Sequence, residues 1–113
     1  MAPQDEIAPF DPRAVDNVMK LGGKKKLDAL IEILNGSAPH RLEDLKKAAT
    51  AAQARTAAQA LKVTAGSLGL ARLEDLCDQV LESGRVPDAA LAKQVEQALG
   101  LGRKALAEHR ARL

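Results

Sequence analysis

The side chains best placed to act together in this chain lie in one segment near its middle. Arg55, Gln59 and Lys62 are polar residues three or four positions apart, and Val63 and Gly66 continue this spacing. On a helix, such spacing places all five residues on one face. The Gln59 carboxamide can donate and accept hydrogen bonds, but its nitrogen is delocalised into the carbonyl and is not a useful nucleophile. The pattern therefore favours binding over catalysis.

The other reactive residue types do not form a recognisable site. His40 and His109 are too few and too far apart in sequence for a zinc site. Cys77 is the only cysteine, which excludes an intramolecular disulfide, and we expect it to be a small core residue. The acidic residues of the next segment have helical spacing and indicate a solvated acidic face; they are Glu74, Asp75, Asp78 and Glu82. We expect no metal and no cofactor.

The segment Ala57–Gly69 has the sequence AAQALKVTAGSLG. It resembles the signature of the histidine-containing phosphotransfer (HPt) domains of bacterial two-component relays, approximately Ala-His-x-Leu-Lys-Gly-Ser-Ala-Gly-x-Leu-Gly. Gln59 stands where that family has its phosphate-accepting histidine, and Val63 stands where it prefers glycine. The resemblance implies that Lys62 would offset phosphoryl charge and that Gly66 would let a partner approach. It also implies a four-helix bundle with short extra N-terminal helices.

Three hypotheses about function follow. The resemblance implies a two-component signalling module that docks a response-regulator receiver domain or a sensor histidine kinase, but that is not an enzyme because Gln59 cannot carry phosphate. An alternative is a working histidine phosphotransfer protein whose acceptor histidine was replaced by Gln59 in the expressed chain. A further alternative is a generic helical interaction or nucleic-acid-binding bundle. The predicted partner-binding residues, hereafter the Gln59 strip, are Arg55, Gln59, Lys62, Val63, Gly66 and Ser67.

Composition limits the kinds of partner. With 17 basic and 15 acidic residues the net charge is only +2, which is weak for a nucleic-acid-binding protein. Phe10 is the only aromatic residue, so the chain has almost nothing on which bases could stack. No stretch approaches the roughly 20 consecutive apolar residues that cross a bilayer. We expect a cytoplasmic protein with no nucleic-acid and no membrane partner.

The chain is rich in alanine, leucine and charged helix formers and has no alternating apolar pattern. This predicts an all-α fold, an up-and-down four-helix bundle with one or two short extra N-terminal helices. At 113 residues we expect one domain, spanning residues 11–113. Residues 1–10 contain two prolines and should form a tail, either laid along the bundle or mobile.

Capping residues predict where the early helices begin and end. Asp11 followed by Pro12 is a favourable helix start. A short helix should end at the glycine pair 22–23, and a second at Asn35–Gly36, with Ser37 capping the next.

Between residues 39 and 65 there is no glycine or proline, but the apolar stripe shifts by about two positions near Thr50–Gln53, which predicts a turn there. Gly69 should end the helix that carries the Gln59 strip, and Gly84 the following one. Asp88 should cap the last helix, and Gly100 with Gly102 should form a weak point within it.

Overall fold

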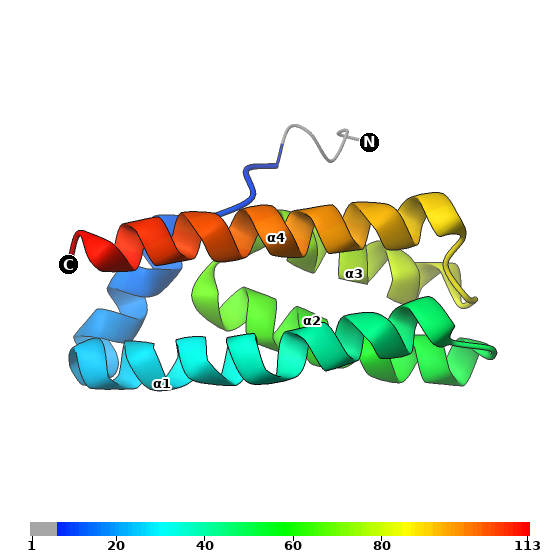
Figure 1. Ribbon diagram of the computed structural model, residues 1–113, viewed down its shortest axis with the longest axis horizontal. Coiled ribbons are helices and arrows are strands. Elements are labelled where there is room, and N and C mark those ends of the chain that lie inside the picture. The colour runs from blue at the N-terminus through cyan, green and yellow to red at the C-terminus, as the bar shows by residue number, and fades with distance from the viewer. Residues whose placement is uncertain (1–6) are drawn as a thin grey trace.

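A computed structural model describes residues 7–113, which form an up-and-down bundle (Figure 1). Its helices are α1 (Pro12–Lys47), α2 (Ala51–Leu68), α3 (Ala71–Ser83) and α4 (Ala89–Ala111), and residues 7–113 contain no strand. Consecutive helices pack against each other, and α4 returns beside α1 to close the bundle. The predicted all-α four-helix architecture is confirmed.

The helix α1 consists of two pieces separated by a kink at Gly23. It begins as predicted, with an Asp11 carboxylate oxygen accepting a hydrogen bond from the Arg13 amide at 3.0 Å and proline in the first turn. At Gly23 the backbone leaves the helical region, with φ 70° and ψ −166°. The piece 12–22 is the short extra N-terminal helix that the sequence predicts. The piece 24–47 is about 36 Å long and runs almost the full 40 Å length of the molecule (Figure 1).

The predicted helix end at Asn35–Gly36 is wrong. The piece 24–47 continues through both residues and through Pro39, and the Ser37 hydroxyl donates to the Ile33 carbonyl at 2.8 Å instead of capping a new helix. The helix continues because the residues on either side of the Asn-Gly pair belong to one apolar stripe. Leu34 and Ala38 are both buried in the core. Packing of an apolar face outweighs the local tendency of Asn-Gly to end a helix.

The remaining caps match their predictions. Thr50 begins α2 by accepting a hydrogen bond from the Gln53 amide at 3.2 Å, which confirms the turn predicted there. Gly69 and Gly84 end α2 and α3 in the left-handed conformation, with φ 80° and 67°. The Asp88 carboxylate caps α4 through the Leu91 amide at 2.8 Å.

The predicted weak point in α4 is wrong, because the helix runs unbroken through Gly100 and Gly102 to Ala111. Gly102 is buried, and a Cβ at this position would lie 2.7 Å from Leu70 Cγ. The glycine therefore allows close packing of α4 on the turn between α2 and α3, rather than bending the helix.

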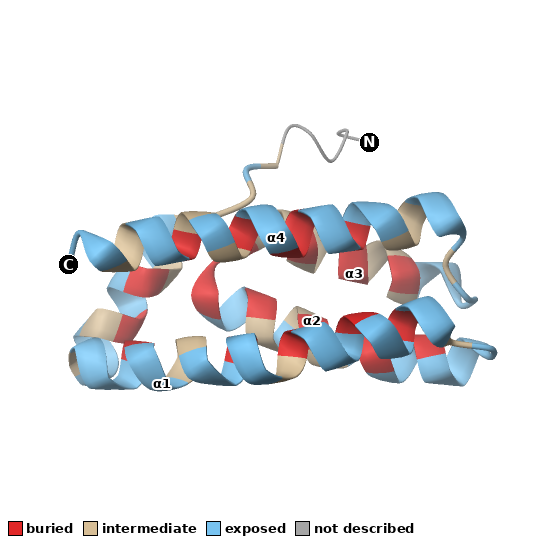
Figure 2. Cartoon of the chain, in the orientation of Figure 1, coloured by how far each residue is buried: buried red, intermediate tan, exposed pale blue. Residues whose placement is uncertain are grey.

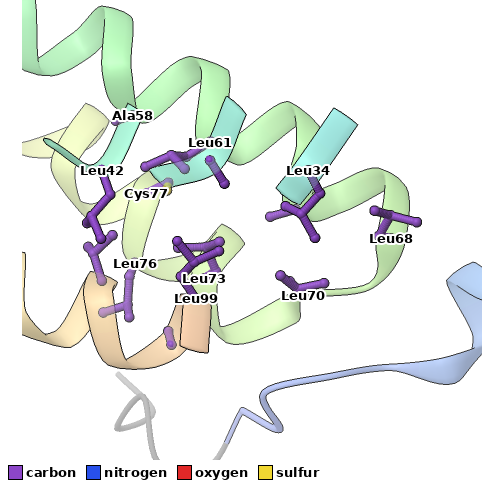
Figure 3. Packing of buried hydrophobic residues seen from close by; sticks show 14 of the residues in the cluster. Leu34, Leu42, Ala58, Leu61, Leu68, Leu70, Leu73, Leu76, Cys77 and Leu99 are labelled. Atoms are coloured by element: carbon purple, nitrogen blue, oxygen red, sulfur yellow. The ribbon is translucent and has the colours of Figure 1, made fainter. Parts of the chain in front are cut away.

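The core runs along the centre of the bundle, and the outward faces of all four helices are exposed (Figure 2). Leucines from every long helix meet there, with Leu34, Leu61 and Leu73 close together (Figure 3). Cys77 is completely buried among them, as predicted (Figure 3). The side chains that α2 contributes to the core are mostly alanines, which lets the neighbouring helices approach closely. The buried residues of α2 are Ala54, Ala57, Ala58, Leu61, Ala65 and Leu68. No helix within residues 7–113 is long and apolar enough to span a membrane.

Residues 7–11 lie along the bundle, against the α2–α3 turn and α4. The Ile7 carbonyl accepts a hydrogen bond from Arg72 Nε at 2.8 Å, and the Asp11 amide donates to the Gly69 carbonyl at 2.7 Å. The ring of Phe10 packs on His109 with 5.6 Å between centroids. The predicted tail, 1–10, falls partly outside the described residues, and its described part, 7–10, is laid along the bundle.

Candidate docking surface

Gln59 lies in the middle of α2 on the side opposite the core. The Thr50 cap and the left-handed Gly69 fix the two ends of this helix. Its alanine and leucine face is buried, which turns the Gln59 strip outward. Arg55, Gln59, Val63, Gly66 and Ser67 are exposed and Lys62 is half-buried, so all six residues of the strip reach the surface.

A shallow hollow of about 690 Å³ surrounds Gln59. Leu81 of α3 forms one side of it, and the rest comes from α2 through Arg55, Thr56, Gln59, Ala60 and Val63. Val63 is 61% exposed, one of the most exposed large apolar side chains described. Around Gln59 the surface therefore combines an apolar base with one amide and one guanidinium, a composition suited to binding. The chemistry available here is hydrogen bonding and apolar contact, without a nucleophile.

The other half of the Gln59 strip is covered by acidic side chains of α3. Lys62 Nζ lies 2.5 Å from an Asp78 carboxylate oxygen. This hydrogen bond, together with the charge of Asp78, raises the pKa of Lys62 above its ordinary value. A Glu74 oxygen lies 2.5 Å from the point where a Cβ on Gly66 would be. Lys62 thus forms an ion pair within the protein, and the Glu74 carboxylate covers Gly66.

The sequence prediction missed these contacts, since it treated Glu74 and Asp78 as part of a solvated acidic face. The positions of these residues in the sequence could have predicted the contacts. Counted outward from Leu70 in the α2–α3 turn, Gly66 and Glu74 are each four residues away, and Lys62 and Asp78 are each eight. Residues at equal distance from a tight turn between antiparallel helices lie opposite each other. Gln59 and Leu81 are each eleven residues from Leu70, and both line the hollow.

The cysteine and the histidines do not add a reactive site. Burial raises the pKa of the Cys77 thiol to about 12, so it is no thiolate nucleophile near neutral pH. His40 is exposed inside α1, and His109 lies half-buried at the end of α4. Its Nε2 atom is buried without a hydrogen-bond partner among residues 7–113. Within that range, no three acidic, histidine or cysteine side chains group as a metal site.

Comparison with known proteins adds no family assignment: no protein-family model, no curated protein and no solved structure matches the chain. The resemblance of Ala57–Gly69 to the HPt signature therefore stays a prediction.

Proposed function

We propose that this protein is a non-catalytic relative of HPt domains, which docks the receiver domain of a response regulator through the Gln59 strip. It acts by occupancy, either by competing with a true phosphotransfer protein or by anchoring a regulator. A sensor histidine kinase that presents a similar surface is the second partner class.

The observation that carries this proposal is the exposure of Gln59 at the centre of a bundle helix, beside an apolar hollow. The HPt-like signature requires its acceptor position to project from the middle of such a helix, and a Gln59 buried among the leucines would have contradicted it. Val63 and Leu81 supply apolar surface next to the amide. Small apolar contacts of this kind, surrounded by polar groups, are typical of protein–protein docking sites.

The glutamine also determines what the module cannot do. Imidazole attacks phosphorus through a ring nitrogen lone pair, which a carboxamide lacks. Gln59 retains a donor and an acceptor at a similar reach, so it can hydrogen-bond an acidic pocket without reacting. A docked receiver would keep its phosphoryl group.

Binding can be tested with a matched pair of variants. Val63→Asp places a charge in the hollow and should weaken capture of a receiver domain at least about tenfold, because an apolar contact at the centre of an interface contributes on the order of 1.4 kcal/mol or more. Ile33→Asp is the control, since Ile33 is 57% exposed on α1 and does not line the hollow. The measurement is calorimetry against the receiver domains of the host. Equal affinities for the two variants would place the docking surface elsewhere.

Phosphotransfer needs a separate test. Incubation with a phosphorylated receiver and kinase should leave the chain unlabelled, and an acid-labile, base-stable label on it would contradict the proposal. The variant Gln59→His tests whether a histidine was replaced in the expressed chain. Rapid transfer to this variant would favour a working relay protein, whereas the proposed docking module predicts little or none.

A further inference from the structure

We propose that the Gln59 strip also binds a second copy of this chain, in a symmetric homodimer in which each protomer covers the strip of the other. The two α2 helices lie antiparallel across a twofold axis that passes between Gln59 and Val63. The dimer is inferred from the shape and charge of the strip alone. Its consequence, that a dimer cannot dock a receiver domain, rests on the proposed function.

The first step is the apolar centre of the strip. Val63 is 61% exposed and stands at the hollow that Ala60 and Leu81 help to line. Gln59 and Val63 are equally far from the level of Leu61, so a twofold axis there places Val63 of one protomer against Gln59 of the other. Each Val63 then enters the hollow of the opposite protomer. Removing this apolar surface from water favours association.

The second step is the close approach that the outward side of α2 permits. Ala60, Gly66 and Ser67 reach the surface on this side, and all three have small side chains or none. The distance between two packed helices depends on the side chains at their contact. Small residues on both sides of the axis therefore let the two copies of α2 approach closely.

The third step is the balance of charge on the strip. Lys62 Nζ lies 2.5 Å from Asp78, so these two charges are paired within each protomer. Arg55 and Glu74 have no ion pair among residues 7–113. The four charges carried by the strip and by the α3 residues that contact it sum to zero. Two copies of this surface can meet without net repulsion.

The fourth step is the placement of the two unpaired charges. Arg55 lies six residues before Leu61, about 9 Å along α2, and Gly66 lies five residues after it, about 7.5 Å. The Glu74 carboxylate lies over Gly66, with an oxygen 2.5 Å from the point that a Cβ on Gly66 would occupy. A twofold axis exchanges these two ends, so Arg55 of each protomer faces Glu74 of the other. This is the self-complementarity that a twofold interface requires.

The oligomeric state of the intact chain is the first measurement. Sedimentation equilibrium should show monomer and dimer with a Kd on the order of 10–100 μM, because one face of a single helix forms an interface below the standard size. Val63→Asp should weaken the dimer at least about tenfold. Ile33→Asp, exposed on α1 and outside the hollow, should leave the Kd unchanged. A chain that stays monomeric up to about 1 mM would overturn the inference.

A pair of charge reversals tests the arrangement itself. Arg55→Glu and Glu74→Arg should each weaken the homodimer about tenfold, because two attractive pairs become two repulsive ones. An equimolar mixture of the two variants should dimerise with about the parent affinity, since both pairs in the mixed dimer are again of opposite charge. This recovery also shows that both variants are folded. A mixture as weak as its components would overturn the proposed arrangement.

Matched controls make the same changes in net charge away from the strip. Lys93→Glu and Glu108→Arg replace exposed residues of α4 that have no ion pair among residues 7–113. Each control should dimerise like the parent, alone and mixed. A control that weakens the dimer as much as Arg55→Glu would assign the effect to net charge and overturn the inference.

Receiver domains then separate the dimer from the docking function. Adding a receiver that binds should dissociate the dimer, because both partners use the Gln59 strip. A receiver that binds monomer and dimer equally would overturn the shared surface and leave docking in place. Dimerisation with the expected charge dependence but without binding of any receiver of the host would overturn the docking function and leave the dimer standing.

Discussion

At the scale of single residues, two left-handed glycines with similar φ angles have different surroundings. At Gly69, with φ 80°, a Cβ would collide with the Asp11 carbonyl oxygen and lie 3.1 Å from Ala14 Cβ. At Gly84, with φ 67°, nothing lies within 4 Å of that point. The first glycine thus joins the start of α1 to the turn that ends α2, while the second only ends α3.

These surroundings predict different costs for an added methyl group. Gly84→Ala should lower the free energy of unfolding by about 1 kcal/mol, the strain of a left-handed alanine. Gly69→Ala should lower it by about 3 kcal/mol, because overpacking against backbone adds to that strain. Urea denaturation of both variants measures the difference. Equal losses would mean that the Asp11–Gly69 contact is not tightly packed in solution.

The pairing of α2 and α3 is what forms the candidate site, at the scale of elements. A short turn at Gly69–Leu70 sets the register, which brings Asp78 to Lys62 and Leu81 to Gln59. The length of α1 matters as well. Its second piece runs through Gly36 and so spans the bundle beside α2, which two shorter helices with a turn between them would not do.

Gly36→Ala tests that continuity directly. Gly36 is exposed in a helix interior with nothing within 4 Å of a Cβ, so alanine should raise the free energy of unfolding by about 0.5–1 kcal/mol. If Gly36 ended a helix in the left-handed conformation, alanine would lower the free energy of unfolding instead. The control is Gly23→Ala at the kink, where φ is 70° and ψ is −166°, a region that essentially only glycine adopts, and the same change should destabilise the protein by about 1–3 kcal/mol. Thermal or urea unfolding of the two variants measures whether each change raises or lowers the free energy of unfolding.

At the scale of the whole molecule, the seam between α1 and α4 is held by polar contacts along its length. Successive links join Lys24 Nζ to the Leu113 carbonyl at 2.8 Å, Asp28 to Arg110 at 2.6 Å and Asn35 to Arg103 at 3.0 Å. Lys24, Arg103 and Arg110 are thereby engaged within the protein. Arg110 binds Asp28 through two hydrogen bonds, a geometry that is stronger and more specific than a single contact.

This pair predicts a dependence of stability on pH. The hydrogen bond from Arg110 lowers the pKa of Asp28 below its ordinary value. The ion pair of Asp28 with Arg110 therefore stabilises the fold at pH values above about 3.9, the pKa of aspartate in the unfolded chain. This stabilisation is lost as pH falls through the lower pKa of Asp28 in the folded protein. Arg110→Gln should be less stable than the parent at pH 7, with a small difference because the pair is exposed, and the difference should disappear as pH falls through the lowered pKa of Asp28 in the folded protein.

Urea denaturation across this pH range provides the measurement, with Lys93→Gln as the control. Lys93 is exposed on the same helix and has no ion pair among the residues described. Its replacement should produce a smaller difference at pH 7. A difference for Arg110→Gln that stays constant with pH would mean that the Asp28 link is not populated.

The sequence by itself determined the helical class, most of the caps and which face of α2 points outward. These features depend on contacts within a few residues: Asp11, Thr50 and Asp88 bind amides of the next turn, and Gly69 and Gly84 adopt a backbone conformation that other residues avoid. The apolar spacing of Ala54, Ala58, Leu61, Ala65 and Leu68 is likewise local, and all five are buried.

Only the tertiary structure decided which local signals prevailed and what lies beside the Gln59 strip. Asn35–Gly36 and Gly100–Gly102 resemble helix breaks, yet burial of neighbouring residues on a continuous face keeps both helices intact. Lys62 looks free in sequence, but the antiparallel register of α3 pairs it with Asp78. Local patterns fix the conformation of each turn, whereas side chains far apart in sequence meet only after the helices have packed, and the charge around the Gln59 strip depends on that packing.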